Sequence, residues 1–313
     1  MTTRRAVLGG LLAAPALIEA ARADGPKELR IGFQKSGILT VVREQGTIEK
    51  RLKPLGVESV RWVEFQYGPP IMEALGLGSV DIGAAGDTPP VFAQVAGAKI
   101  VYAAATPAQQ SAILLPANST IGSLPDLKGK RVAFAKGSSS HNFVVRALEK
   151  ANLTPADITP AFLNPADAVA AFARGSVDAW AVWDPYFALA ETRHGAKVLT
   201  TTDGILDSNS FYLANKDYAA RNPLVLKAAL DGIGESTAWA AGNRERLAQI
   251  MAAATGVELD AQRRTVDRLK IEVTPITDRI AASQQGIADT FFKLGLVPRA
   301  VTVRDAVWTA PQT

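Results

Sequence analysis

Three consecutive serines follow a short apolar run and precede a histidine and an asparagine, in Lys136-Gly137-Ser138-Ser139-Ser140-His141-Asn142. Gly137 allows a tight turn at the end of a strand. The serines then open a helix, whose first N–H groups and positive end attract anions. One serine is enough to cap a helix, so three indicate hydroxyl donors for a ligand. Because no Gly-Lys-Ser or Gly-Lys-Thr follows, the stretch is not a phosphate P-loop.

Two aspartates occupy matching positions after buried, strand-like runs. Asp87 lies in Gly86-Asp87-Thr88-Pro89, and Asp184 lies in Trp183-Asp184-Pro185-Tyr186. An aspartate in such a position caps the following helix by accepting backbone N–H bonds, and it also shapes the loop. Trp183 stands at the exit of its strand, where an aromatic side chain can wall a cleft. Trp180 lies inside the strand and is expected in the core.

These polar segments belong to a pattern that the chain presents twice. Gly78-Ser79-Val80-Asp81 returns as Gly175-Ser176-Val177-Asp178, and Asp87 returns as Asp184 at the same spacing of 97 residues. The run at 30–35 also returns, at 131–136. Two stretches that recur in the same order predict two similar α/β lobes. A cleft between lobes is a preferred place for a small ligand.

Strands and helices alternate through both copies. Apolar runs bounded by Gly and Pro predict strands at 29–33, 60–65, 80–85, 99–105, 131–134, 159–162 and 179–182, and helices at 70–77, 88–96, 139–151 and 165–174. This order predicts parallel-rich sheets with helices on both faces. Ligands of such sheets bind beyond the carboxyl ends of the strands, which is where the polar segments lie.

The last part of the chain changes character. After a further strand-like run at 210–214, helices are expected at 223–241, 243–253, 260–270 and 277–294. The simplest arrangement places residues 24–112 and 211–313 in a first lobe with a helical C-terminal region. Residues 113–210 are then inserted as a second lobe. The chain is expected to cross between the lobes near 112–115 and near 208–211.

Residues 1–23 have the features of a secretory signal peptide. Arg4-Arg5 precedes an apolar run at 6–18, and Ala21-Arg22-Ala23 gives a small-residue cleavage pattern. The arginine pair leaves both the Sec route and the twin-arginine route open.

The charge and composition of the rest of the chain argue against two classes of ligand. Without residues 1–23 the formal net charge of +4 falls to +2, and the interspersed charges argue against nucleic-acid binding. No cysteine and only two histidines argue against a metal site.

Six motifs in order resemble the aliphatic-sulfonate-binding proteins of bacterial ABC importers. They are Ile31-Gly32-Phe33-Gln34-Lys35, Trp62-Val63-Glu64-Phe65, Gly78-Ser79-Val80-Asp81, the run 86–94, the serine-rich run 136–142 and the run 178–186. The resemblance implies a periplasmic two-lobed binding protein of the second structural type. Such a protein closes around its ligand and delivers it to a membrane-embedded permease, as a monomer without a cofactor or catalytic residues. Ser36-Gly37 departs from the Gly-Ser order common in the family, which affects the geometry of that loop.

A sulfonate suits the expected site. It is a permanent monoanion with three acceptor oxygens, so its site needs N–H and O–H donors. A helix start supplies positive potential without the cost of burying Lys or Arg. His141 is expected either to donate a further hydrogen bond or to brace the loop as a neutral ring. The expected ligand contacts are Gln34, Ser36, Gly86, Asp87, Thr88, Gly137, Ser138, Ser139, Ser140, His141, Trp183 and Asp184.

The same architecture also suits taurine, nitrate, another organosulfur anion or a pyrimidine precursor of thiamine. An ammonium-bearing ligand such as taurine requires Asp184 or Glu64 to be free to pair with it. An enzyme is disfavoured, because the cysteine-rich motif of related pyrimidine-synthesising proteins is absent. His194 lies in an expected surface turn and completes no Ser-His-Asp arrangement.

Overall fold

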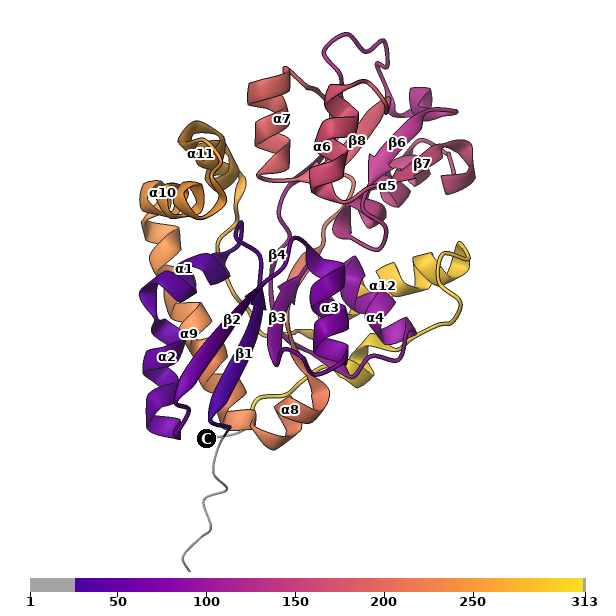
Figure 1. The fold of residues 1–313 in the computed structure, drawn as a ribbon. Coiled ribbons are helices and arrows are strands. Elements are labelled where there is room, and N and C mark those ends of the chain that lie inside the picture. Colours follow the sequence, from indigo (N-terminus) through magenta and orange to yellow (C-terminus); the bar gives the residue numbers. More distant parts are fainter. Residues whose placement is uncertain (1–25, 312–313) are drawn as a thin grey trace, which may run out of the picture.

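The computed structural model describes residues 26–311 and contains two lobes, each built on a five-stranded sheet (Figure 1). The expected signal peptide, residues 1–23, lies outside the described residues. The first sheet, in the order β2-β1-β3-β10-β4, consists of β1 (Glu28–Phe33), β2 (Ser59–Glu64), β3 (Ile82–Ala85), β4 (Ile100–Pro107) and β10 (Asn209–Asn215). The second, in the order β7-β6-β8-β5-β9, consists of β5 (Ser111–Leu115), β6 (Arg131–Phe134), β7 (Thr159–Phe162), β8 (Ala179–Trp183) and β9 (Lys197–Thr201).

Both sheets are parallel-rich, as the sequence predicts, and each contains one antiparallel strand. In the first sheet β10 pairs antiparallel with β3 and β4, and in the second β5 pairs antiparallel with β8 and β9. The route of the chain explains this exception. The chain leaves β4 at the edge that faces the other lobe, so it enters β5 at that same edge, and β9 leads into β10 in the same way. A strand that starts where its neighbours end must run opposite to them.

The two crossings between the lobes lie side by side. Residues 108–110 join β4 to β5, and residues 202–208 join β9 to β10. Ala108 donates its N–H to Ser208 O (3.2 Å), and Thr202 donates to Ser111 O (3.0 Å). The expected lobe boundaries fall late, because residues 111–112 already pair with β8 and residues 209–210 already pair with β4. No Gly or Pro separates residues 108–110 from β5, so the sequence gives no sign that the strand begins at Ser111.

Helices cover both faces of the first sheet, because each presents an apolar stripe to it. One face carries α1 (Ile38–Gln45), α2 (Thr47–Leu52), α8 (Lys216–Arg221) and α9 (Pro223–Gly242). The other carries α3 (Gly68–Gly76), α4 (Thr88–Val95) and α12 (Asp278–Lys293). Two further helices, α10 (Arg244–Thr255) and α11 (Leu259–Arg268), pack on α1 through Val41. They reach towards the second lobe (Figure 1).

The second lobe repeats the layered arrangement with fewer helices. α5 (Ser139–Lys150) packs on one face of its sheet, and α6 (Pro165–Ala173) and α7 (Tyr186–His194) pack on the other. Trp180 is buried between β8 and these helices, as expected. Short 3-10 helices occur at Lys53–Leu55, Leu124–Leu127, Pro155–Asp157 and Val303–Ala306. Among residues 26–311, no helix has both the length and the apolar character needed to cross a bilayer.

The repeated Gly-Ser-Val-Asp motif has the same structural role in both lobes. Asp81 accepts a hydrogen bond from the backbone N–H of Arg30 (2.8 Å) and pairs with its guanidinium group (2.6 Å). Asp178 binds Arg131 in the same way (2.7 and 3.0 Å). Each pair ties the start of β1 or β6 to the loop before β3 or β8. The repeated motif therefore lies at the end of each sheet that faces away from the other lobe, and its role there is structural.

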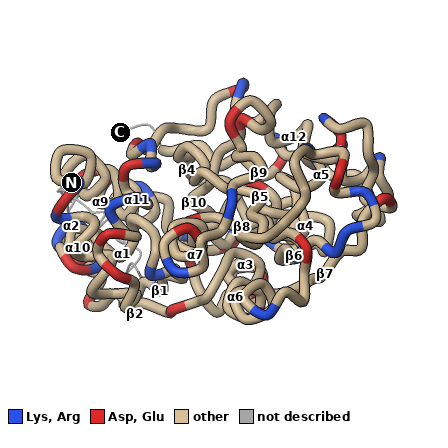
Figure 2. The backbone as a smooth tube through the Cα atoms, turned by 90° about the horizontal axis from the view of Figure 1, so that it is seen from above, with Lys and Arg blue, Asp and Glu red and all other residues tan. Residues whose placement is uncertain are grey.

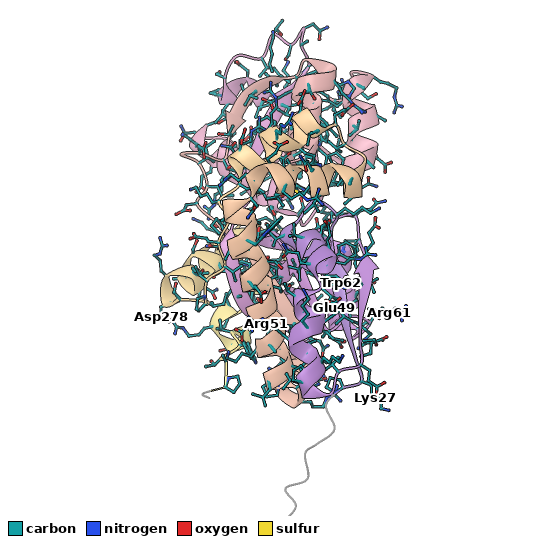
Figure 3. All side chains as sticks on the ribbon, turned by 90° about the vertical axis from the view of Figure 1, so that its left-hand side faces the viewer. Lys27, Glu49, Arg51, Arg61, Trp62 and Asp278 are labelled. Atoms are coloured by element: carbon teal, nitrogen blue, oxygen red, sulfur yellow. The ribbon has the colours of Figure 1, made fainter. Side chains whose placement is uncertain are left out.

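Trp62, in another of the motifs, also serves the packing of the first lobe. Its ring meets Phe33 edge-on at 5.6 Å, and its indole N–H donates to Glu49 of α2 (2.9 Å; Figure 3). Charged residues of both signs are interspersed over the elements of both lobes (Figure 2). No described element stands out by its charge, so the candidate site is sought between the lobes, where the carboxyl ends of the parallel strands of the two sheets face each other.

Candidate functional site

A cavity lies between the two lobes at the carboxyl ends of their strands. Its volume is about 140 Å³, and it is partly open to solvent. Most of its lining surface is apolar, which suits the organic tail of a ligand better than a bare inorganic anion. Of the expected contact residues, those that line the cavity are Gln34, Ser36, Gly86, Ser138, Ser139 and Trp183. Those that lie outside the lining are Asp87, Thr88, Gly137, Ser140, His141 and Asp184.

Helix α5 directs an uncapped N-terminus at the cavity. Gly137 turns the chain out of β6 with a φ of 72°, which glycine adopts without strain. Ser138 follows at the N-cap, but its hydroxyl donates backwards to Ala135 O (2.7 Å) and makes no capping bond. Ser139 lines the cavity, and its hydroxyl forms no hydrogen bond within residues 26–311. The first N–H groups of α5 and the Ser139 hydroxyl are therefore available to an anion.

Gly86 and Ser139 approach each other closely across the cavity. A Cβ atom added to Gly86 would lie 1.8 Å from Ser139 Oγ and 3.1 Å from Ser139 Cβ. The first distance is an overlap and the second is tighter than most real contacts, so a larger residue at position 86 requires Ser139 to rotate away from its place in the lining or the lobes to separate. The loop after β3 and the start of α5 thus form one narrow, polar end of the cavity.

Ser140 and His141 lie behind the wall of the cavity. Both are buried, and Ser140 Oγ has no hydrogen-bond partner among the described residues. His141 Nδ1 accepts a hydrogen bond from the Gly137 N–H (3.2 Å), so the ring braces the turn. Burial lowers the pKa of His141 to about 4, and the positive charge of Lys136 contributes further. The ring is therefore neutral at pH 7, which agrees with the second of the two roles expected for it.

Asp87 and Thr88 are buried at the start of α4. Asp87 Oδ1 accepts hydrogen bonds from the Thr88 N–H (2.6 Å) and hydroxyl (2.8 Å). Asp87 Oδ2 accepts one from the amide of Asn142 on α5 (2.7 Å), which links the two lobes. Burial raises the pKa of Asp87, and the hydrogen bonds from Asn142 and Thr88 oppose that rise. The carboxylate thus faces donors inside the protein and does not face the cavity.

Asp184 is held in a second link between the lobes. Arg268, at the end of α11, pairs with Asp184 (3.1 Å) and with Glu191 of α7. Its guanidinium group lies over the ring of Phe187, 3.8 Å from the centroid. Burial raises the pKa of Asp184, and the charge of Arg268 opposes that rise. Like Asp87, Asp184 shapes the interface between the lobes and leaves the cavity free of its charge.

The remaining lining residues form a largely apolar wall that also carries amide groups, hydroxyl groups and one lysine, Lys270. Trp183, which is half-buried, and Phe211 face the cavity from β8 and β10. Gln34 donates to Ala84 O (3.3 Å), and Gln109, in the first crossing, donates to Ser36 O (3.4 Å). These bonds fix the loop after β1 against β3 and the crossing. The cavity therefore has a polar end near α5 and an apolar body.

Sequence reasoning missed the contribution of the helical C-terminal region. Met251, Leu269, Lys270 and Ile271 line the cavity from α10 and from the segment after α11. No motif signals them, because they lie within or directly after a helix and only the packing of α10 and α11 on α1 brings them to the cavity. The structure also shows no cluster of three or more His, Cys, Asp or Glu side chains arranged to hold a metal ion within residues 26–311.

Comparisons with known proteins agree with this architecture. The sequence profile described as NMT1/THI5 like matches residues 63–246, more than half of the chain. An aliphatic sulfonates-binding protein of Escherichia coli (strain K12) is 40% identical over 309 residues, which cover 97% of this chain and 96% of the relative. The chain belongs to the family of aliphatic-sulfonate-binding proteins. This confirms the resemblance of the six motifs.

Solved structures of aliphatic-sulfonate-binding proteins share the fold. The alkanesulfonate-binding protein SsuA from Xanthomonas axonopodis pv. citri, bound to MOPS, is 36% identical, with a TM-score of 0.87 over 91% of this chain and 99% of that one. The periplasmic aliphatic sulphonate binding protein SsuA from Escherichia coli is 40% identical, with a TM-score of 0.84 over 92% and 94%. The expected two-lobed binding-protein fold with parallel-rich sheets is thereby confirmed.

Proposed function

We propose that the protein is a solute receptor that binds an organic sulfonate in the cavity between its lobes and delivers it to an ABC permease for uptake of sulfur. One observation carries the proposal. The polar end of the cavity offers N–H and O–H donors from an uncapped helix start, and no Asp or Glu is among the lining residues. Both nearby aspartates, Asp87 and Asp184, are bonded inside the protein. A sulfonate accepts hydrogen bonds and donates none, so it suits such a lining.

The apolar lining of the cavity favours an organic sulfonate over small inorganic anions. Nitrate or sulfate at the start of α5 leaves the space beside Trp183, Phe211 and Met251 unfilled. An alkyl tail buries apolar surface there, at about 25 cal/mol for each Å² removed from water. Sulfonates with tails are therefore expected to bind more tightly than either inorganic ion.

We further propose that the receptor acts in the periplasm as a monomer after removal of residues 1–23, and that it catalyses no reaction. The names of its relatives, which are binding proteins, support this assignment. His141, the one histidine beside the serines, has its Nδ1 atom occupied by the Gly137 N–H and activates no hydroxyl group. Incubation with alkanesulfonates is expected to return them unchanged, and release of sulfite or any other product would overturn the non-enzyme assignment.

Calorimetry with butanesulfonate on paired serine variants tests the binding function. Ser139→Ala removes a free hydroxyl donor from the lining, and loss of one charge-assisted bond, worth about 1.5–3 kcal/mol, weakens binding by roughly 10- to 100-fold. Ser138→Ala is the matched control, because the hydroxyl of Ser138 is already committed to Ala135 O. It is expected to change the affinity by less than about threefold. Absence of saturable binding to the wild-type protein would overturn the proposal.

A further inference from the structure

We propose that Lys270 reads the charge at the far end of the bound sulfonate, so that the receptor favours sulfonates whose tail ends in a second anionic group and disfavours those that end in an ammonium group. This inference rests on the proposed function and adds a substrate class to it. Lys270 lies in the segment after α11, where no sequence motif marks a site.

Lys270 is the one residue with a formal charge among those that line the cavity in the described part of the chain. Its side chain is exposed and forms no ion pair with any other described residue. Arg268, two residues earlier, differs in both respects, since it is committed to Asp184 and Glu191. A free cation on the wall of a largely apolar cavity is available to a ligand group of opposite charge.

The carboxylates that would attract an ammonium group are committed elsewhere. Asp184 is buried and bound by Arg268 and by the Ala188 N–H (3.0 Å), and it does not line the cavity. Glu64 pairs with Lys35 (3.0 Å) and is also absent from the lining. The condition that an ammonium-bearing ligand requires, a free Asp184 or Glu64, is therefore not met.

Lys270 and the expected sulfonate site lie at opposite ends of the cavity. Leu269 and Ile271 belong to the cluster formed with α1, α10 and α11, whereas Gly86 and Ser139 lie at the starts of α4 and α5. Figures 1 and 2 show α10 and α11 on one side of the molecule and α4 and α5 on the other. A sulfonate held at α5 therefore directs its tail towards Lys270.

The end of the cavity near Lys270 has positive electrostatic potential, like the end near the start of α5. Helix α1 begins beside it, with Ile38 on the cavity wall and Gly37 as an N-cap that provides no side-chain bond. The uncapped N–H groups of α1 add positive potential to that of the Lys270 ammonium group. A carboxylate or second sulfonate at the end of the tail gains from both, and an ammonium group is repelled by both.

Three ligands of equal length provide the test. Butanesulfonate, 4-sulfobutanoate and 3-aminopropanesulfonate each carry three methylene groups after the sulfonate and end in a methyl, a carboxylate and an ammonium group respectively. Interaction of Lys270 with an exposed charge is worth up to about 1 kcal/mol, of opposite sign for the two charged tails. We expect the wild-type protein to prefer 4-sulfobutanoate to 3-aminopropanesulfonate by about 10-fold at low salt.

Charge variants at one position isolate the role of Lys270. Lys270→Gln is expected to bring the two charged ligands within about threefold of each other, and Lys270→Glu to reverse their order, with butanesulfonate affinity nearly constant. Lys53→Glu makes the same charge change in the 3-10 helix of the first lobe, away from the cavity, and is expected to preserve the wild-type order. An affinity ratio that is the same in wild type and Lys270→Glu would overturn this inference alone. Failure of wild type to bind butanesulfonate would overturn the proposed function and this inference with it.

Discussion

Two segments related by the internal repeat, Gly86-Asp87 and Trp183-Asp184, share their aspartate but differ in the residue before it and in the partner of the carboxylate. Each follows the third strand of its repeat, and each aspartate is buried. Each aspartate is bound by a donor from the other lobe, but the donors differ. A neutral amide, that of Asn142, binds Asp87, whereas the guanidinium group of Arg268 binds Asp184. The residue before the aspartate is a glycine that admits Ser139 in one loop and a tryptophan that walls the cavity in the other.

The comparison shows that the same aspartate in a repeated pattern can join the lobes in two different ways. Burial raises the pKa of both carboxyl groups, so each needs compensation from its partner. At Asp184 the compensation includes an opposite charge, which makes that link costly to break. At Asp87 only neutral donors compensate. The lobes are therefore joined by a strong ionic contact on the α11 side and by a weaker neutral contact on the α5 side.

The largest expected effect comes from removing Arg268. Arg268→Ala leaves Asp184 buried without its cation, and breaking a buried ion pair in this way typically costs about 3–5 kcal/mol of unfolding free energy. Urea unfolding of the ligand-free protein measures the loss. Arg193→Ala is the matched control, because Arg193 also links the lobes, through Glu258, but both side chains are more than half exposed. Solvent screens that pair, so equal losses in the two variants would contradict the difference drawn between buried and exposed links.

A pH-dependent loss of stability is expected at His141, which has no counterpart in the first loop of the first lobe. The pKa of His141 is about 4 in the folded protein, against about 6.5 for an unfolded histidine, so protonation favours unfolding. The stabilisation that comes from keeping His141 neutral is fully present above pH 6.5. It is lost as the pH falls towards 4, which lowers the free energy of unfolding by about 3 kcal/mol. Unfolding free energies of wild type and His141→Phe, measured over this range, isolate the effect. Parallel pH profiles of the two proteins would show that His141 is not held neutral by the fold.

Gly86→Ala tests the role of the glycine that replaces a tryptophan in the repeat. The added methyl group collides with Ser139, so either its hydroxyl rotates away from the ligand or the lobes separate, and we expect sulfonate binding to weaken by roughly 100-fold, about 2.7 kcal/mol. Gly83→Ala serves as the control, because its Cβ would meet Ile71 at 2.4 Å inside the first lobe. That variant is expected to lower stability instead. Unchanged calorimetric affinity in Gly86→Ala would show that binding does not need the contact with Ser139.

The smallest expected effect concerns the neutral link. Asn142→Ala removes one hydrogen bond to the Asp87 carboxylate, worth about 1.5–3 kcal/mol, but it also removes the buried Asn142 Oδ1 atom, which has no partner in the described part of the chain. We therefore expect a net loss of about 1–2 kcal/mol in urea unfolding. A loss as large as that of Arg268→Ala would remove the distinction between a charged and a neutral partner.

Much of the fold was predictable because its strands are short apolar runs ended by glycine or proline. The strands at 131–134 and 159–162 have the predicted bounds, and most helices differ by one to three residues. β5 was missed because the crossing before it carries no turn signal, and β9 because Lys197–Thr201 is half-polar at the edge of its sheet. Antiparallel strands follow from the route of the chain, which local patterns do not encode.

The candidate site was predictable where it follows the ends of strands. Ser138, Ser139 and Gly86 line the cavity because parallel strands deliver the loops after them to one edge of the sheet. The two aspartates accept backbone N–H bonds at the starts of helices, as expected, but neither lines the cavity, and their partners, Asn142 and Arg268, are 55 and 84 residues distant in the chain. Lys270 and Met251 reach the cavity only through helix packing, which is a tertiary property without a local signature.

Because the two crossings between the lobes lie side by side, the second lobe is joined to the first at a single place in space. The ends of the second lobe meet at the Thr202–Ser111 hydrogen bond, and the interrupted ends of the first meet at Ala108 and Ser208. The stretch from 109 to 207 can therefore be exchanged for that of a relative with two neighbouring chain joints, provided that the donor retains the partners of Asp87 and Arg268. A chimaera built in this way would combine the serine-rich turn of one protein with Lys270 of the other. The preference for the sulfonate group and the preference for the end of the organic tail could then be varied separately.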